Sequence, residues 1–470
     1  MITSPAFAGR KYAVLGLARS GLASVEALVA SGAQVLAWDK SEDARARALQ
    51  ILPGTGRGTA ARSVVVEGAQ LEAGGPRHPP RSGEDLFTLA DPLTADLTGF
   101  AGIVVSPGVP LNRHPIARKA REAGVPLIGD IELFAQARAA LPPHKVVGIT
   151  GTNGKSTTTA LVHHIVKTAG LPTRMAGNIG YPILAQNPLP AGGVYVLELS
   201  SYQIDLTHSL DCEVAVLLNV TPDHLDRYDS FEDYRDSKLR LFDMQNVGTG
   251  LAIIPDEDRS LWRDLVERVQ QVNLAFIAST DFESGRNPGF GPSDWSQLQG
   301  PHNKLNASAA YLVARGLGIA DQIIAEGLRT YPGLPHRMER VAEREGVLFV
   351  NDSKATNPDS AAPALASFPA VHWILGGLPK SVDLGPCEAQ LGHVRAAYTI
   401  GEAGPLFARL LEGKVPVRQC EMLVEAVQCA AHAAAPGEVV LLSPACASFD
   451  QFRDYEARGE AFRAAVEALA

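Results

Sequence analysis

The sequence contains few cysteines, no long hydrophobic run and no excess of positive charge. Its five cysteines are odd in number and show no C-x-x-C spacing, so they predict reduced thiols in a cytosol and no structural zinc site. No apolar run approaches the roughly 18 residues of a membrane-spanning helix, and the N-terminal stretch shows no cleavable signal. A formal charge of -9 argues against a dedicated nucleic-acid binder, which needs a basic face. We therefore expect a cytoplasmic protein without membrane insertion.

The rest of the composition is typical of a folded globular protein. Hydrophobic residues make up 46% and charged residues 20% of the 470 positions. The chain is too long for one core, and domain-size statistics predict about three domains. The 44 glycines and 32 prolines indicate many turns. These properties predict an α/β or α+β protein.

A glycine-bearing loop stands between an apolar strand and a predicted helix in VVGITGTNGKSTT. Gly151 and Gly154 let the backbone turn its N–H groups toward an anion. Lys155 adds a positive charge, and Ser156 offers a hydroxyl to a magnesium ion. The general pattern G-x-x-x-x-G-K-[ST] has a further glycine where this chain has Ile149, so an ordinary glycine-rich turn is the alternative.

The N-terminal segment KYAVLGLARSGLASVEALVASGAQVLAWDK reads as strand, glycine turn, helix and strand, which is a Rossmann-type opening. The dinucleotide fingerprint G-x-G-x-x-G appears as G-L-A-R-S-G, with Ala18 at the middle glycine and Asp39 ending the second strand. Three alternatives follow: a dinucleotide site, a site for another nucleotide-bearing ligand, or a fold element without a ligand. Residues 51–81 lack periodicity and predict a surface insertion.

Another apolar run of this part, AGIVVS, leads into Ser106, Pro107 and Gly108. Such an end places free N–H groups at a sheet edge, where open α/β sheets bind ligands, although a simple turn is equally consistent. The later pair Pro142–Pro143 predicts a linker to the part that carries the glycine-bearing loop.

Three polar residues are candidates for a site near that loop, two at the ends of predicted strands and one on a predicted helix. Glu198 ends an apolar strand, where such ATPases place a carboxylate near magnesium. His224 lies just past a second strand and is either a surface residue or part of the same site. Lys238 lies on an amphipathic helix, for which a solvated lysine is the default interpretation.

The segment QLQGPHNKLNASAAYLVARGLGI opens an alanine-rich helix in which Asn303 and Asn306 are most simply N-caps. It lacks the aspartate of the guanine-reading motif N-K-x-D, which disfavours a GTPase. Prolines then predict a second boundary near Pro335. The remaining chain alternates strands and helices as a doubly wound sheet does, and polar residues at its strand ends predict a site. These residues are Asp352, Lys354, Lys380 and Ser448.

Several short segments occur along the chain in the order GTNGKST, ELSSYQ, NVTPDHLDRY, GPHNKLNA, PHRMER, NDSKATNPDS, LGG and SPACASFDQF. The Mur ligases have such segments in the same order, and the chain resembles this family over nearly its whole length. GTNGKST also resembles the loop of the wider superfamily that includes the folylpolyglutamate synthases. NDSKATN and SPACASFDQF are similar in particular to the members that add D-glutamate.

The resemblance implies an α/β fold with a Rossmann-like UDP-binding domain at 1–135, a central P-loop ATPase domain at 136–335 and a C-terminal Rossmann-like domain at 336–470 that binds the incoming amino acid. It also implies that ATP phosphorylates the terminal carboxylate of UDP-N-acetylmuramoyl-L-alanine and that the amine of D-glutamate attacks the acyl phosphate. A tetrahedral intermediate then collapses to the amide, a step of peptidoglycan precursor synthesis. The implied cofactors are ATP, two Mg²⁺ ions and a carbamylated Lys238. The expected partners are small-molecule substrates, and a monomer is expected.

Site residues follow from the resemblance at matching positions. ATP contacts are implied for Gly151, Thr152, Asn153, Gly154, Lys155, Ser156, Thr157, Asn303, Asn306, Arg337 and Asp352. UDP-substrate contacts are implied for Arg19, Ser20, Asp39, Lys40, Ser106, Pro107, Gly108, Asn178 and Ser200. D-Glutamate contacts are implied for Thr356, Lys380, Ser448, Phe449 and Tyr455, the last at a position that is commonly Phe. Metal contacts are implied for Ser156, Glu198, His224 and Lys238, and catalytic roles for Lys155, Lys238, His224 and Lys354.

Three alternatives compete with this interpretation. The first is another ligase of the superfamily, against which NDSKATN and SPACASFDQF weigh. The second is an NAD-dependent dehydrogenase that uses the N-terminal glycine turn and Asp39, which leaves the glycine-bearing loop unexplained. The third is a nucleotide-binding regulatory protein without catalysis, which would tolerate loss of Lys238.

Overall fold

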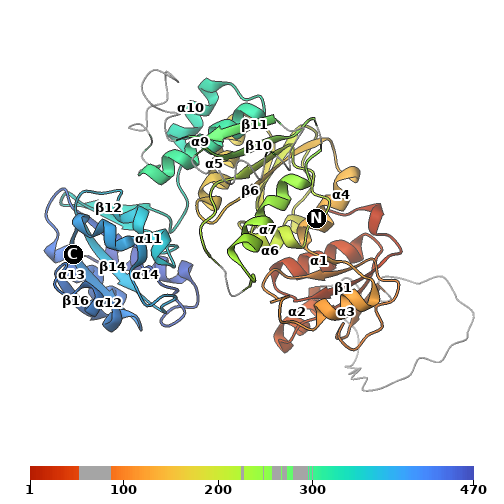
Figure 1. Ribbon diagram of the computed structural model, residues 1–470, viewed down its shortest axis with the longest axis horizontal. Coiled ribbons are helices and arrows are strands. Elements are labelled where there is room, and N and C mark those ends of the chain that lie inside the picture. Colours follow the sequence, from red (N-terminus) through yellow and green to blue (C-terminus); the bar gives the residue numbers. More distant parts are fainter. Residues whose placement is uncertain are drawn as a thin grey trace, which may run out of the picture.

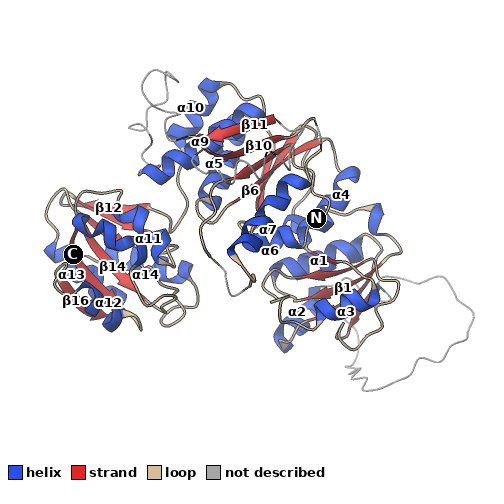
Figure 2. Cartoon of the chain, viewed as in Figure 1, coloured by secondary structure: helices blue, strands red, loops and turns tan. Residues whose placement is uncertain are grey.

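The computed structural model describes residues 1–51, 86–223, 227–246, 248–256, 266, 273–278, 295, 297–298 and 300–469. In these residues the chain forms three sheets that follow one another along the sequence, with helices on both sides of each sheet (Figure 1, Figure 2). The α/β class predicted from the sequence is confirmed. The predicted insertion beyond residue 51 and the predicted site residue His224 lie outside the described residues.

The first sheet is parallel, with strands in the order β3-β2-β1-β4-β5. Val14 and Val104 lie in one hydrophobic cluster while Ala13 and Ile103 lie in another, so the central strands are buried on both faces. The strand order reverses beside β1, and ligands of such sheets bind at this point. The strands are β1 (Lys11–Leu15), β2 (Gln34–Trp38), β3 (Phe87–Leu89), β4 (Gly102–Val105) and β5 (Leu127–Ile128), with helices η1 (Pro5–Phe7), α1 (Arg19–Ala30), α2 (Glu42–Ile51) and α3 (Ile116–Ala123).

The second sheet has the order β11-β10-β9-β6-β8-β7, and all of its pairings are parallel. Val147 and Ile149 of β6 pack with Leu161 and Ile165 of α5 on one face, while Val146 joins the cluster on the other face. Each of these apolar side chains is fully buried, which contributes about 1.5–3 kcal/mol per residue. This packing fixes the loop between β6 and α5 at the carboxyl edge of the sheet.

The elements of this part are β6 (His144–Thr150), β7 (Thr173–Gly177), β8 (Gly193–Glu198), β9 (Val214–Leu217), β10 (Leu251–Pro255) and β11 (Asn273–Ile277), with helices α4 (Asp130–Ala137), η3 (Arg138–Ala140), α5 (Lys155–Thr168), η4 (Ile183–Ala185), α6 (Ser201–Asp205), α7 (Phe231–Asp243), α9 (Pro301–Gly316) and α10 (Asp321–Thr330). α4 precedes the Pro142–Pro143 pair, yet its Glu132 accepts hydrogen bonds from the backbone of His208 and Ser209.

The third sheet has the order β12-β13-β17-β14-β15-β16. Its interior strands are parallel, as predicted, but the edge strand β12 is antiparallel to β13. The sequence analysis did not predict this hairpin, whose turn places Glu345 and Gly346 at φ 50° and 77°. The elements are β12 (Glu339–Arg344), β13 (Val347–Asn351), β14 (Val371–Gly376), β15 (Val394–Ile400), β16 (Val417–Glu421) and β17 (Val439–Leu442), with helices α11 (Pro358–Leu365), η7 (Gly385–His393), α12 (Gly404–Leu411), α13 (Leu423–Ala433) and α14 (Tyr455–Glu467).

Two local expectations are wrong. The N-cap of α9 is Gly300, so Asn303 and Asn306 lie inside the helix and do not cap it. Ser106 does not offer a free N–H, because that group donates to the carbonyl oxygen of Leu15 at 3.0 Å, and Pro107 has no N–H. Among the helices of the described residues, none combines the length and hydrophobicity needed to span a membrane.

Candidate active site

The loop between β6 and α5 forms an anion-binding arrangement. Gly151 and Gly154 have φ values of 149° and 83°, which favour glycine. A Cβ atom on Gly154 would lie 2.3 Å from Oδ1 of Asn306, so this position also needs glycine for space. α5 begins directly after it without a side-chain cap. The first N–H groups of the helix and its positive dipole end therefore remain available to an anion.

Two lysines meet at this loop. Nζ of Lys155 donates to the carbonyl oxygens of Gly151 and Thr152 at 2.9 and 2.8 Å. Nζ of Lys238, from α7, donates to the same Gly151 oxygen at 3.0 Å and lies 4.4 Å from the ring centre of Tyr234. The expectation of a solvated Lys238 is wrong, since its side chain is only 1% exposed.

Burial changes the chemistry of both amines. It lowers the pKa of Lys238 to about 7, and the charge of Lys155 acts in the same direction. Burial also lowers the pKa of Lys155, an effect that the Glu198 carboxylate opposes. A substantial fraction of Lys238 therefore has a neutral, nucleophilic amine at neutral pH.

Two side chains with oxygen atoms lie beside these lysines. Glu198 ends β8, next to Ile149 of β6, and its side chain is 2% exposed. Its Oε1 accepts from Nδ2 of Asn178 at 3.1 Å, while Oε2 is buried without a hydrogen-bond partner among the described residues. Oγ of Ser156 accepts from Nη2 of Arg337 at 2.6 Å. A hydroxyl and an unpaired buried carboxylate oxygen fit the oxygen-ligand preference of Mg²⁺.

A cavity of about 510 Å³ opens beside the loop, between the second and third sheets. Asn306 anchors one wall, because its Oδ1 accepts from Oγ1 of Thr158 at 3.2 Å and its Nδ2 donates to Oδ1 of Asn303 at 3.0 Å. The cavity thus brings together predicted residues from both parts of the chain. These are Asn153, Gly154, Thr157, Asn303, Asn306, Arg337, Asp352 and Lys354.

The sequence analysis missed the apolar side of this cavity. Pro255 and Ile277 line it from the last positions of β10 and β11, together with His302 and Tyr331. Burial lowers the pKa of His302 to about 4, so its imidazole is neutral at physiological pH. Nδ1 of His302 and the Tyr331 hydroxyl are buried without hydrogen-bond partners among the described residues. Such a wall suits a flat heteroaromatic base, and the ends of β10 and β11 were the signal that could have revealed it.

Two charged residues reach the cavity from the third sheet. Asp352 follows β13 and accepts hydrogen bonds from the Met338 backbone N–H at 3.2 Å and the Ser443 hydroxyl at 2.9 Å. Burial nevertheless raises its pKa to about 7. Lys354 lies 3.9 Å from the ring centre of Tyr455, and burial lowers its pKa to about 8. Both groups therefore change charge near neutral pH.

The loops predicted to bind D-glutamate lie at the same edge of the third sheet. Nζ of Lys380 donates to Oγ1 of Thr356 at 3.4 Å. A bridge between Leu378 and Ala447 pairs the Lys380 loop with the Ser448 loop. Phe449 is 69% exposed, in contrast to the buried Ser448. These loops therefore lie together, but the side chains of Lys380 and Phe449 are exposed to solvent.

Arg458 of α14 holds the backbone of this edge together. Its guanidinium is 1% exposed and donates to the hydroxyl and carbonyl oxygens of Ser353 at 3.0 and 2.9 Å. It also donates to the carbonyl oxygens of Gly376, Cys446 and Ala447 at 3.4, 3.0 and 3.2 Å. One buried cation therefore joins the loops that follow β13, β14 and β17.

The predicted UDP-binding residues of the first sheet form a separate group. Asp39 accepts from the backbone N–H groups of Leu17 and Ser41 at 2.7 and 2.8 Å. The Ser106 hydroxyl donates to the carbonyl oxygen of Gly16 at 3.1 Å, which closes the glycine turn on the end of β4. Arg19, Lys40 and Gly108 are exposed, whereas Ser20 and Pro107 are half-buried.

The remaining two predicted residues of this group lie on the second sheet. The exposed Asn178 contacts Glu198, and Ser200 caps α6 through a reciprocal pair of hydrogen bonds with Gln203. Arg227, which the sequence analysis missed, donates to the carbonyl oxygens of Gly108 and Val109 at 3.0 and 2.9 Å. This contact joins the first sheet to the second at the edge where the predicted residues gather.

Comparisons with known proteins agree with this arrangement. The model of the Mur ligase middle domain matches residues 149–314, and that of the Mur ligase glutamate ligase domain matches residues 336–446. The UDP-N-acetylmuramoylalanine--D-glutamate ligase of Novosphingobium aromaticivorans is 58% identical, with 100% of this chain and 97% of that protein aligned. The enzyme of the same name from Zymomonas mobilis is 53% identical, with both chains fully covered.

A solved structure with the same fold is the MurF ligase of Thermotoga maritima in complex with ADP. It has a TM-score of 0.56 at 17% identity and covers 98% of this chain and 96% of that one.

Proposed function

This chain belongs to the Mur ligase family, and on that premise we propose that it joins D-glutamate to UDP-N-acetylmuramoyl-L-alanine at the expense of ATP. The observation that carries the proposal is the identity of 58% over the full chain with a ligase of that name. Family membership leaves no support for the dehydrogenase alternative. The domain limits 1–135, 136–335 and 336–470 stay part of this proposal.

The reaction begins with activation of a poor electrophile. A carboxylate resists attack by an amine until one oxygen becomes a phosphate leaving group. We assign Lys155 and the start of α5 to the phosphates of ATP, because they present a cation and uncapped N–H groups at one place. The apolar cavity wall at Pro255 and Ile277 receives the adenine. Asn303, Asn306, Arg337 and Asp352 line the rest of the nucleotide site.

Ser156 and Glu198 are the residues that would hold Mg²⁺, because a hydroxyl oxygen and an unpaired buried carboxylate oxygen are ligands of the kind that this ion prefers. When bound, Mg²⁺ offsets the negative charge that develops on the transferring phosphoryl group. His224 is proposed for the same environment from its matching position alone.

Lys238 has the properties that carbamylation requires. The ammonium group first loses one proton, and the neutral Nζ then bonds to the carbon of CO₂ and releases a second proton, so a cation becomes a carbamate anion. A pKa near 7 supplies the neutral amine, and the neighbouring Lys155 favours the anionic product. The carbamate would then provide oxygen ligands for a second Mg²⁺.

The amino-acid step is assigned to the loops of the third sheet. Lys380 is placed opposite the side-chain carboxylate of D-glutamate, with Thr356, Ser448, Phe449 and Tyr455 around the substrate. The attacking amine forms a tetrahedral intermediate whose collapse breaks the bond to phosphate. Lys354, whose pKa is lowered to about 8 by burial, is assigned to the departing phosphate.

The UDP moiety is assigned to the first sheet and the edge of the second. Asp39 and the turn at Ser106 stand where the strand order reverses, and Arg19 and Lys40 add exposed positive charges beside them. Asn178 and Ser200 are placed along the muramoyl part of the substrate.

The test is phosphate release from ATP and Mg²⁺ with UDP-N-acetylmuramoyl-L-alanine and one amino acid at a time. D-Glutamate should support release, and the nucleotide substrate should gain the mass of one glutamyl residue. L-Glutamate, meso-diaminopimelate, L-lysine and buffer alone should not. Release with another amino acid but not with D-glutamate would overturn the substrate assignment and leave the ligase chemistry standing.

A further inference from the structure

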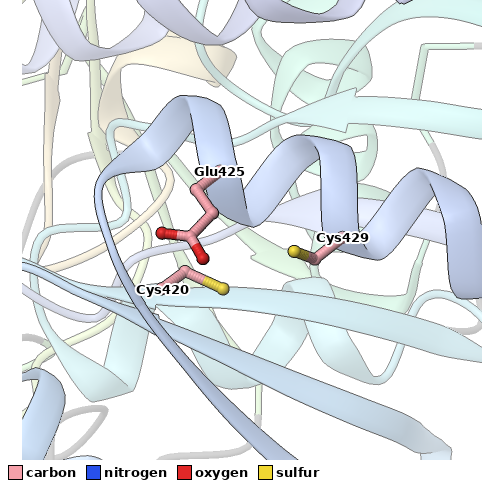
Figure 3. A group of neighbouring side chains, drawn as sticks. All are labelled: Cys420, Glu425 and Cys429. Atoms are coloured by element: carbon pink, nitrogen blue, oxygen red, sulfur yellow. The ribbon is translucent and has the colours of Figure 1, made fainter.

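Two of the cysteines meet in the third part of the chain, far along the sequence from the phosphate-binding loop. Cys420 lies on β16, while Glu425 and Cys429 lie on α13 (Figure 3). The sulfur atoms and a carboxylate oxygen all lie within 4.8 Å of one another. The absence of C-x-x-C spacing gave no sign of this group, because its two cysteines are nine positions apart and belong to different elements.

The fold itself brings the three residues together. β16 ends at Glu421, whose φ of 55° begins the short turn into α13. The turn reverses the chain, so that the beginning of α13 packs on the strand it has just left. Glu425 and Cys429 are four positions apart and therefore lie on the same face of the helix. Figure 3 shows both side chains directed toward Cys420.

We propose that Cys420, Glu425 and Cys429 form a binding site for a thiophilic divalent cation such as Zn²⁺, separate from the nucleotide site. Two thiolates and one carboxylate are ligands that Zn²⁺ accepts in tetrahedral sites, and two sulfurs select against Mg²⁺ and Ca²⁺. The cluster is open to solvent on the Glu425 side, since Glu425 is exposed and Cys429 is half-buried. A water molecule therefore takes the fourth coordination position, and the ion exchanges with solvent.

The charges around the cluster fit a cation. Two thiolates and a carboxylate exceed the charge of one divalent ion by a single negative charge, and the guanidinium of Arg418 acts on Cys420 to offset it. Without an ion, burial and the neighbouring Cys429 raise the pKa of Cys420 to about 12. Binding must therefore release the Cys420 proton.

A disulfide between the two cysteines is the competing outcome. A disulfide would involve only the two sulfur atoms. It would not explain why the Glu425 carboxylate also lies within 4.8 Å of them. The three-residue cluster thus favours a cation over oxidation.

Cadmium titration of the reduced, chelator-treated full chain tests the proposal, because a cadmium–thiolate pair absorbs in the ultraviolet and a cadmium–carboxylate pair does not. One ion per chain should produce the band. Cys420→Ser and Cys429→Ser should each abolish it, and Glu425→Gln should weaken the apparent affinity about tenfold. Zn²⁺ should then displace Cd²⁺ and remove the band.

Cys387→Ser is the matched control, since Cys387 is also buried in the third part but only donates to the carbonyl oxygen of Pro358, a contact that serine can keep. This variant should titrate as the natural chain does. Cys429→Ser provides a second, less buried change if Cys420→Ser does not fold. An unchanged band in the folded Cys429→Ser variant would overturn the proposal. The absence of any band would also overturn it. So would the loss of two hydrogen atoms in mass on mild oxidation, in a chain that binds no Cd²⁺.

Discussion

The nucleotide site and the amino-acid loops hold their charged groups in opposite environments. Lys238 is 1% exposed and Glu198 is 2% exposed in the first, whereas Lys380 is exposed and Phe449 is 69% exposed in the second. Burial moves pKa values in the nucleotide site, to about 7 for Lys238 and Asp352 and about 8 for Lys354. The groups that we assign to phosphate are thus already shielded from water, while the groups that we assign to the amino acid remain exposed until a substrate covers them.

The largest expected effect concerns the buried lysine of the nucleotide site. Lys238→Ala removes the amine that we propose to carry the carbamate, and turnover should fall at least about 100-fold, as when a key charge-stabilising group is lost. Acetate or formate should restore part of the activity, because a small carboxylate can occupy the same space. Steady-state phosphate release measures both effects. Lys167→Ala, on the exposed side of α5, is the control. Full activity in Lys238→Ala would refute the proposed role.

The next effect distinguishes a steric clash from backbone strain at Gly154. Gly154→Ala places a Cβ 2.3 Å from Oδ1 of Asn306 at a φ of 83°, so the apparent affinity for ATP should fall about tenfold or more. Gly170→Ala is a matched control, because Gly170 has a similar φ of 74° but no neighbour within 4 Å. Binding of a fluorescent ATP analogue reports the difference. Equal losses in both variants would show that strain alone accounts for the effect.

A third effect, on stability and not on affinity or turnover, tests the buried carboxyl group of the nucleotide site. Burial raises the pKa of Asp352 from 3.8 to about 7 in the folded chain, so the folded state binds the proton more tightly. The stability that Asp352 contributes is therefore full below about pH 3.8 and is lost as the pH rises through about 7. This change should amount to about 4 kcal/mol.

Asp352→Asn should remove that part of the pH dependence. Urea midpoints of the natural chain and the variant, measured between pH 4 and pH 8, give the comparison. The lysines with lowered pKa values have the same effect in both chains and cancel. Parallel pH profiles would indicate that Asp352 is ionised in the folded protein throughout this range.

The smallest effect concerns the exposed lysine of the amino-acid loops. Lys380→Ala should raise the KM for D-glutamate about tenfold, the value of one charge-assisted contact near the surface, and leave the KM for ATP unchanged. Lys414→Ala is the control, since Lys414 is exposed in the same part and pairs with Glu388. A rise in the KM for ATP of the same size would mean that the two sites are not as separate as their environments suggest.

Local sequence predicted the glycine-bearing loop between β6 and α5 and the Rossmann-type opening, because glycine positions and apolar strands determine both. It could not predict the burial of Lys238, which depends on α7 packing against a loop 87 positions away in sequence. The resemblance to a family implied a role for this residue at the loop, and the structure has its amine against the Gly151 carbonyl oxygen, whereas the local sequence suggested a solvated side chain. The roles of the individual residues, including those of His224 and the UDP-binding group, stay predictions.

Other errors have the same origin. Asn303 and Asn306 looked like caps because a sequence pattern does not show which helical positions face a cavity. The antiparallel strand β12 was missed because a short polar strand at a sheet edge carries little hydrophobic pattern. Cys420 and Cys429 meet only through the turn that folds α13 back onto β16. Each of these features depends on contacts between elements, which a linear pattern does not contain.

The buried guanidinium of Arg458 has a consequence for movement. It ties the ends of β13, β14 and β17 into one unit, and these ends carry Asp352, Lys354 and the loops of Lys380 and Ser448. Rotation of the third part about the chain near Pro335 would therefore carry all of these side chains along the same arc. The distances among them would stay fixed, and only their distance from the phosphate-binding loop would change. In such a rotation a single angle would set how the groups assigned to the amino acid align with the groups assigned to phosphate.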